Sequence, residues 1–146
     1  MTSEIPSGRR LALDYGASRV GIAISDTSGI LATPLKVTSI EDIEDELVRI
    51  NQEVEFKVIY IGLPKHLSGA EGESAKAARE LAANLAKMFK VPISLVDERL
   101  TTRSASVDSE AVRKYGIDAV AAKEILELAL AGEKSSKKIF GDVLKI

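Results

Sequence analysis

Three acidic residues that are far apart in the sequence each stand at the end or start of a predicted element. Asp14 ends an apolar strand, Glu98 follows another strand, and Asp118 opens the last predicted helix. Carboxylates without Cys or His neighbours are the ligands that Mg²⁺ or Mn²⁺ prefers. Carboxylates held close together repel one another, and a divalent cation relieves that repulsion. If the three acids meet, they predict a site for two such cations, which can drive phosphodiester hydrolysis.

Each acid also has an ordinary structural explanation. Asp14 could cap a hairpin turn. Asp118 stands where a helix N-cap belongs, and such a cap stabilises a helix by roughly 1 kcal/mol. Glu98 could be a solvated residue beside Asp97 and Arg99. The three acids therefore indicate catalysis only if the fold brings them to one place.

Alternating apolar residues and short turns predict that the chain begins with an antiparallel meander, with strands at 10–14, 19–26 and 31–37. Nearly continuous apolar runs predict two further strands, buried on both faces, at 57–62 and 93–97. Apolar residues at helical spacing predict helices over 40–52, 74–90 and 118–132. Residues 101–114 carry a weaker helical pattern.

This order of elements predicts an α/β fold with a five-stranded mixed sheet, an antiparallel meander plus parallel strands, flanked by helices. Strand–helix–strand units pair their strands in parallel, so the carboxyl ends of those strands meet at one edge of the sheet. Ligands of open α/β sheets bind at that edge. We therefore expect Asp14, the loop at 62–65 and the segment 97–99 to converge there.

Length and composition indicate one globular domain. The chain has 146 residues, of which 45% are hydrophobic and 29% are charged, the balance of an ordinary globular protein. We expect a lead-in at 1–8, one domain over 9–132 and a tail at 133–146. No apolar run approaches the roughly 18 residues of a spanning helix, residues 1–8 lack the apolar stretch of a secretory signal, and the sequence contains no cysteine. We expect a cytoplasmic protein that has no membrane partner.

The charge balance argues against binding to nucleic acid through bulk positive charge. The net charge is −2 and the isoelectric point is near 5.5. A polyanion must therefore be held by local cations. The candidates for phosphate contact are Arg19, Lys65, Arg99 and Arg103, although each could equally be a solvated surface charge.

Two other functions fit part of the sequence. An Asp-x-Gly turn followed by a glycine on the next strand also opens the phosphate-binding hairpin of the sugar kinase and actin-like proteins. Those proteins clasp ATP between two related domains, and this chain has room for one, with no second such hairpin. The other possibility is a non-catalytic nucleic-acid-binding factor of the transcription or ribosome-assembly machinery, which would not need converging acids.

Five segments stand out along the chain: Leu13–Asp26, Ala32-Thr-Pro-Leu35, Ile61-Gly-Leu-Pro64, Val96-Asp-Glu-Arg-Leu-Thr-Thr102 and Ile117-Asp-Ala-Val-Ala-Ala122. In this order they resemble the signature blocks of the YqgF/RuvX family, whose members are described as Holliday junction resolvases and as pre-16S rRNA nucleases. The resemblance implies a ribonuclease H-like fold. It also matches Asp14, Glu98 and Asp118 to the acidic positions of the family.

The resemblance, together with the acids, predicts a hydrolase. We expect a metal-dependent endonuclease, with Mg²⁺ or Mn²⁺, that processes the 5′ end of precursor 16S rRNA in ribosome biogenesis. A Holliday junction resolvase acting on DNA is the alternative, because nothing in the sequence specifies a reader of the 2′-hydroxyl. The chain departs from the family pattern at Ser18 and in the loop Lys65–Ala70, so substrate contacts are less well defined than the acids.

Overall fold

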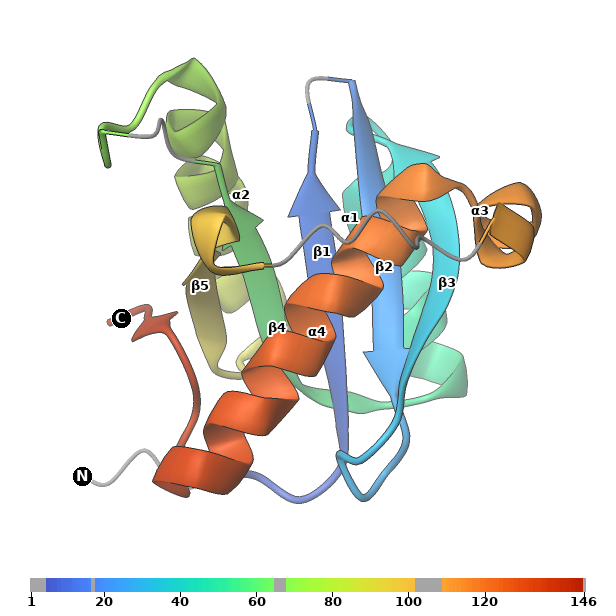
Figure 1. The fold of residues 1–146 in the computed structure, drawn as a ribbon, viewed down its shortest axis with the longest axis vertical. Coiled ribbons are helices and arrows are strands. Elements are labelled where there is room, and N and C mark those ends of the chain that lie inside the picture. Colours follow the sequence, from blue (N-terminus) through green and yellow to red (C-terminus); the bar gives the residue numbers. More distant parts are fainter. Residues whose placement is uncertain (1–4, 17, 65–67, 102–108, 146) are drawn as a thin grey trace.

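A six-stranded mixed sheet forms the centre of the computed structural model, which describes residues 5–16, 18–64, 68–101 and 109–145 (Figure 1). Strands β1 to β3 form the predicted antiparallel meander, and β4 and β5 extend it in parallel with β1. The order across the sheet is β3-β2-β1-β4-β5-β6. The strands are Arg9–Tyr15 (β1), Arg19–Ser25 (β2), Ala32–Ser39 (β3), Phe56–Leu63 (β4), Ile93–Asp97 (β5) and Asp142–Val143 (β6).

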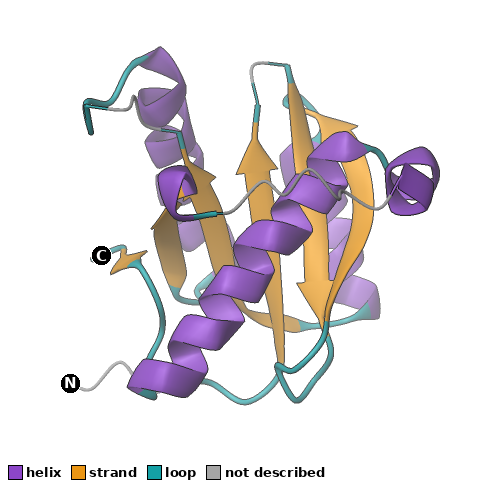
Figure 2. Cartoon of the chain, in the orientation of Figure 1, coloured by secondary structure: helices purple, strands orange, loops and turns teal. Residues whose placement is uncertain are grey.

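Helices cover both faces of the sheet (Figure 2). α1 and α2 lie on one face, and α4 crosses the other face diagonally, as Figure 1 shows. The buried residues of α1 recur at helical spacing. Lys90 caps the end of α2 with a left-handed φ of 52°, two residues before Pro92. The helices are Ile43–Glu53 (α1), Glu73–Phe89 (α2), Ser109–Tyr115 (α3) and Ile117–Ser136 (α4), and a 3₁₀ turn spans Glu98–Leu100 (η1).

The two faces of the sheet differ in the size of their side chains. The face toward α1 and α2 carries large residues, among them Leu13, Ile22 and Ile61. Because side chains alternate along a strand, the other face carries the residues between them, and on β1 and β2 these include the small residues Ala12 and Ala23. Small residues let the backbone of α4 approach the sheet closely.

The end of the chain differs from the prediction in two ways. α4 does not stop at Gly132 but continues to Ser136, and Lys137 closes it with a left-handed φ of 60°. Gly132 instead lies against a ring, since a Cβ there would be 2.1 Å from Cδ1 of Phe140. Residues 142–143 then pair antiparallel with β5 as a sixth strand, where five were predicted. The amide of Leu144 also donates to the carbonyl of Ile93 at 2.8 Å. Near the end of the chain Ile139 is buried in the core, and Phe140, Val143 and Leu144 pack against the core while partly buried.

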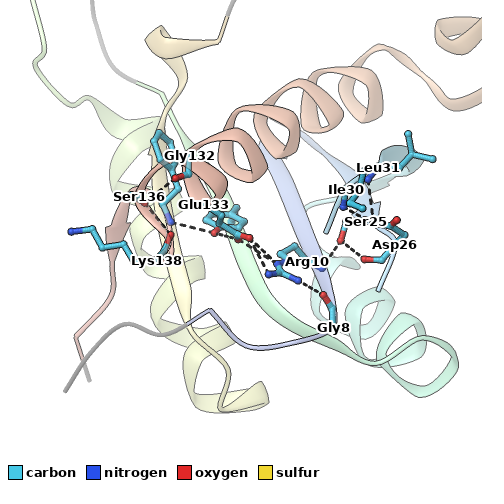
Figure 3. Close-up of polar contacts among 12 residues, drawn as sticks. Gly8, Arg10, Ser25, Asp26, Ile30, Leu31, Gly132, Glu133, Ser136 and Lys138 are labelled. Atoms are coloured by element: carbon cyan, nitrogen blue, oxygen red, sulfur yellow. Dashed lines mark hydrogen bonds and ion pairs between the residues drawn. The ribbon is translucent and has the colours of Figure 1, made fainter. Parts of the chain in front are cut away.

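A buried charged network ties β1 to the end of α4 (Figure 3). The Nε and Nη2 atoms of Arg10 lie 3.1 and 3.0 Å from Glu133 Oε1, and both side chains are about 6–7% exposed. The hydroxyl of Tyr60 donates to the same carboxylate and accepts from the amide of Phe140 at 3.3 Å. Burial, and then the carboxylate of Glu133, raise the pKa of Tyr60 well above its usual value. This network lies at the end of β1 opposite to Asp14.

Candidate active site

Asp14 occupies the last but one position of β1, between two glycines. In the sheet register it pairs with Gly21 of β2 on one side and with Gly62 of β4 on the other. Its side chain faces α4, as those of Ala12 and Ala23 do. Asp14 is 8% exposed, and no hydrogen bond or ion pair joins its carboxylate to another residue in the described part of the chain. A buried carboxylate in such a place is costly unless a cation approaches it.

Glu98 fills the space that Gly62 leaves open. A Cβ on Gly62 would lie 3.0 Å from Glu98 Oε1 and 3.2 Å from Glu98 Cγ. The backbone of Glu98 is fixed by η1, since its carbonyl accepts from the amide of Thr101 at 3.1 Å and from the Thr101 hydroxyl at 2.7 Å. The Oε1 atom is buried. Glu98 therefore lies over the residue that neighbours Asp14 in the sheet.

The backbone of Asp118 lies against Gly21, the β2 residue that pairs with Asp14. A Cβ on Gly21 would lie only 1.9 Å from the carbonyl oxygen of Asp118, so the first turn of α4 rests directly on this glycine. Asp118 does not cap the helix, because the N-cap residue is Gly116. Its side chain is 25% exposed and forms an ion pair with Arg19, whose Nε lies 3.1 Å from Asp118 Oδ2.

The fold thus brings the backbones of the three predicted acids to the two flanks of one position in the sheet. The side chains do not form a ready metal site: among the described residues, no group of three His, Cys, Asp or Glu side chains is placed to hold an ion. The Asp118 carboxylate is turned toward Arg19. The metal-binding role of the three acids therefore stays a prediction. Asp14 and Glu98 both lie beside Gly62, whereas Asp118 is paired with Arg19.

Of the four predicted phosphate contacts, the structure describes two. Arg19 is 64% exposed in its side chain and reaches the acids through Asp118. Arg99 instead donates two hydrogen bonds to the carboxylate of Asp97, from Nη2 to Oδ2 at 2.7 Å and from Nε to Oδ1 at 3.1 Å. These hydrogen bonds raise the pKa of the Arg99 guanidinium. Lys65 and Arg103 lie outside the described residues.

Gly21 and Gly62 have a role in the site that the positions of the acids alone do not predict. Both interrupt strands that are otherwise apolar, and a glycine inside a strand often marks the close approach of another backbone or of a ligand. Here Gly21 admits the start of α4 and Gly62 admits the Glu98 side chain. That signal was available in the sequence, whereas the side-chain partner of Asp118 was not.

A hollow that none of these acids lines is found elsewhere on the molecule. It has a volume of about 730 Å³ along the first half of α2, and charges of both signs line it, including Glu71 and Arg79. Those two are joined by paired hydrogen bonds of 2.7 Å. A smaller groove of about 330 Å³ adjoins Asp118.

A family model described as "RuvX: Holliday junction resolvase" matches residues 8–132 of the chain. The chain belongs to the RuvX family. This confirms the resemblance seen in the signature segments. RuvX members are nucleases, so the chain is a hydrolase that acts on nucleic acid.

Close RuvX relatives match nearly the whole chain. A protein from Streptomyces avermitilis is 39% identical over 150 residues, which cover 95% of this chain and 96% of the relative. One from Thermobifida fusca is 38% identical over 154 residues, covering 95% and 97%. Both relatives carry the name "Putative pre-16S rRNA nuclease".

The structural comparison concerns the fold. Two structures of Thermus thermophilus RuvC, one of them in complex with a Holliday junction substrate, align with TM-scores of 0.60 and 0.61. The alignments cover 94% and 93% of this chain and 99% of each RuvC chain, at 10% and 11% identity. The ribonuclease H-like fold expected of this RuvX member is thereby confirmed. No helix in the described part of the chain is both long and apolar enough to span a bilayer.

Proposed function

We propose that the chain is a metal-dependent endonuclease of the cytoplasm that trims the 5′ end of precursor 16S rRNA. The observation that carries this proposal is the buried Asp14 carboxylate between two glycines, one of which accommodates Glu98 and the other the start of α4 with Asp118. The choice of RNA rests on the names of the relatives.

The donor set suits Mg²⁺ or Mn²⁺, because it consists of carboxylates alone. Asp14 and Glu98 would hold the cation, and Asp118 would join them after leaving Arg19. When bound, two such ions activate water for attack and stabilise the leaving oxygen of a phosphodiester. Asp14 is buried at the sheet, and Arg19 would offer a guanidinium to a substrate phosphate beside the acids.

The test measures cleavage and ion binding separately. Purified protein is incubated with precursor rRNA, single-stranded RNA and a four-way DNA junction, in Mg²⁺, Mn²⁺ or EDTA, alongside Asp14→Asn and Glu98→Gln. The matched control is Asp45→Asn, an exposed carboxylate on α1, at the opposite face of the sheet. Calorimetric titration with Mn²⁺ reports ion binding without turnover, and thermal melting reports folding.

We expect cleavage of precursor rRNA that EDTA abolishes, that both site variants lose together with Mn²⁺ binding, and that Asp45→Asn retains. Cleavage that survives EDTA and both substitutions would refute the mechanism. Cleavage confined to the DNA junction would favour the resolvase activity that the family description names. Tight RNA binding without any cleavage would identify a non-catalytic factor.

A further inference from the structure

A groove beside Asp118 combines positive charge with an aromatic ring. It lies between the β2–β3 hairpin and the junction of α3 with α4, and its volume is about 330 Å³. That volume is within the range of about 300–1,000 Å³ typical of ligand sites. The side chains that give it its chemistry belong to Arg19, Lys36, Lys114, Tyr115, Ile117 and Asp118.

The charge in the groove contrasts with that of the chain. Three cations meet one carboxylate there, whereas the whole chain carries a net charge of −2. Lys36 is bound to Glu46 at 2.8 Å, and Arg19 is bound to Asp118. Within the described residues Lys114 has no ion pair, so its ammonium is available to an incoming anion.

The aromatic residue of the groove is placed beside that ammonium. Lys114 Nζ lies 5.2 Å from the centroid of the Tyr115 ring. Tyr115 is half-buried, and the neighbouring Ile117 is 58% exposed. Cations that follow a backbone, together with an aromatic surface on which bases stack, are the features with which proteins bind single-stranded nucleic acid.

The junction that carries Tyr115 is fixed against the sheet. Gly116 joins α3 to α4 with a φ of +95°, and a Cβ on it would lie 2.8 Å from Val37 Cγ2. The amide of Gly116 also donates to the carbonyl of Val112 at 2.9 Å. The ring is therefore held at a defined place, one turn of chain from Asp118.

We propose that this groove binds a single-stranded segment of the polynucleotide substrate next to the bond that is cut, with a base against Tyr115 and a phosphate at Lys114. The adjoining phosphate binds Arg19 and takes it from Asp118, which frees this carboxylate to turn toward Asp14 and Glu98. The inference rests on the proposed nuclease function and adds to it the path of the substrate strand.

The first test measures binding without metal. A fluorescein-labelled 12-nucleotide oligouridylate is titrated in EDTA, and anisotropy reports the Kd. Tyr115→Ala is expected to weaken binding about 5- to 150-fold, the range for loss of base stacking on one aromatic side chain, while Tyr115→Phe retains it. Lys114→Ala is expected to lower the slope of log K against log salt by about 0.7 in magnitude, the loss of one phosphate contact. Lys134→Ala, an exposed cation in the last turns of α4, is the matched control and leaves both quantities unchanged.

The second test addresses the exchange at Arg19 with two variants of equal charge. Asp118→Asn and Asp14→Asn each remove one carboxylate, but only the first releases Arg19. In EDTA, Asp118→Asn is therefore expected to bind the oligonucleotide several-fold more tightly than Asp14→Asn. Equal affinities of these two variants would overturn the exchange.

The groove and the proposed function fail in different ways. Unchanged affinity and salt slope in folded Lys114→Ala and Tyr115→Ala proteins, or no binding by the unmodified protein, would overturn the groove whatever the cleavage assay gives. Circular dichroism and melting temperatures confirm that the variants are folded. EDTA-resistant cleavage would overturn the metal mechanism and leave the binding measurements in place.

Discussion

Gly62→Ala tests whether the Glu98 carboxylate belongs to the reacting centre. The new methyl group would lie 2.5 Å from Ile125 Cδ1, 3.0 Å from Glu98 Oε1 and 3.2 Å from Glu98 Cγ. The Ile125 atom is the end of a flexible side chain and can move aside, so we expect a cost of about 1 kcal/mol, at the low end of overpacking effects. In a chain of this size, that lowers the melting temperature by roughly 2–4 °C.

The effect on catalysis should exceed the effect on stability. Two atoms of Glu98 are crowded at once, so the carboxylate must move by a few tenths of an ångström or more. Misplacement of a reacting group by 1 Å costs about 10²-fold in rate, and we therefore expect kcat for precursor rRNA to fall about 10-fold or more. The assay is single-turnover cleavage with Mg²⁺, well below the melting temperature.

Gly132→Ala supplies the matched control. Its methyl group would lie 2.1 Å from Phe140 Cδ1, so it also crowds a side chain, but at the far end of α4 from the acids. We expect a comparable loss of stability and a cleavage rate within about twofold of the unmodified chain. If Gly62→Ala cleaves as fast as Gly132→Ala, Glu98 is not part of the reacting centre.

Four further substitutions test the packing and the charges. In Gly21→Ala the new methyl group would lie 1.9 Å from the carbonyl oxygen of Asp118, so α4 must move away by about 1.5 Å. We expect the free energy of unfolding to fall by about 3 kcal/mol and the melting temperature in calorimetry to fall by roughly 6–12 °C. A fall of less than about 2 °C would contradict the contact. Arg10→Met leaves Glu133 buried without its cation, and urea unfolding should show a loss of about 3–5 kcal/mol. Adding Glu133→Gln should restore part of that loss, and strictly additive losses would speak against the pairing. The hydrogen bond from Lys36 holds the pKa of Glu46 below its ordinary value of 4.5, so the pair stabilises the fold above that pH and the contribution is lost as the pH falls through the lowered pKa. Lys36→Met should therefore lower the free energy of unfolding modestly at pH 7, with the difference vanishing in acid, and a difference that persists in acid would exclude the ionic origin.

Much of the fold was readable because its signals are local. Apolar alternation identified the meander, and the continuous run at 57–62 identified a strand covered on both faces, since burial on both faces leaves no polar positions. The sixth strand escaped prediction because two residues carry no periodicity, and their pairing depends on the backbone of β5. The helix predicted over 118–132 ends at Gly132 because glycine commonly follows the end of a helix, whereas in the structure Gly132 lies within α4 and accommodates the ring of Phe140, eight residues later.

The candidate site was readable in part. The family segments and the ends of strands identified Asp14, Glu98 and Asp118 as acids that could share one edge. Which cation each acid contacts depends on side-chain geometry that no spacing encodes, and the pairing of Asp118 with Arg19 is an example. The groove at Tyr115 was not predicted from the sequence for a similar reason. The residues that line it come from β2 and β3 and from the junction of α3 with α4, which are about 80 residues apart in the chain.

The pairing of Arg10 with Glu133 has a consequence for how the molecule is made. These residues are 123 positions apart, so β1 leaves the ribosome roughly 6–25 s before its partner at ordinary elongation rates. Until α4 has been synthesised, the sheet face that carries Asp14 stays open to water, and Asp118 has no fixed place. The proposed mechanism therefore predicts that a nascent chain does not cleave nucleic acid until translation has passed its last long helix.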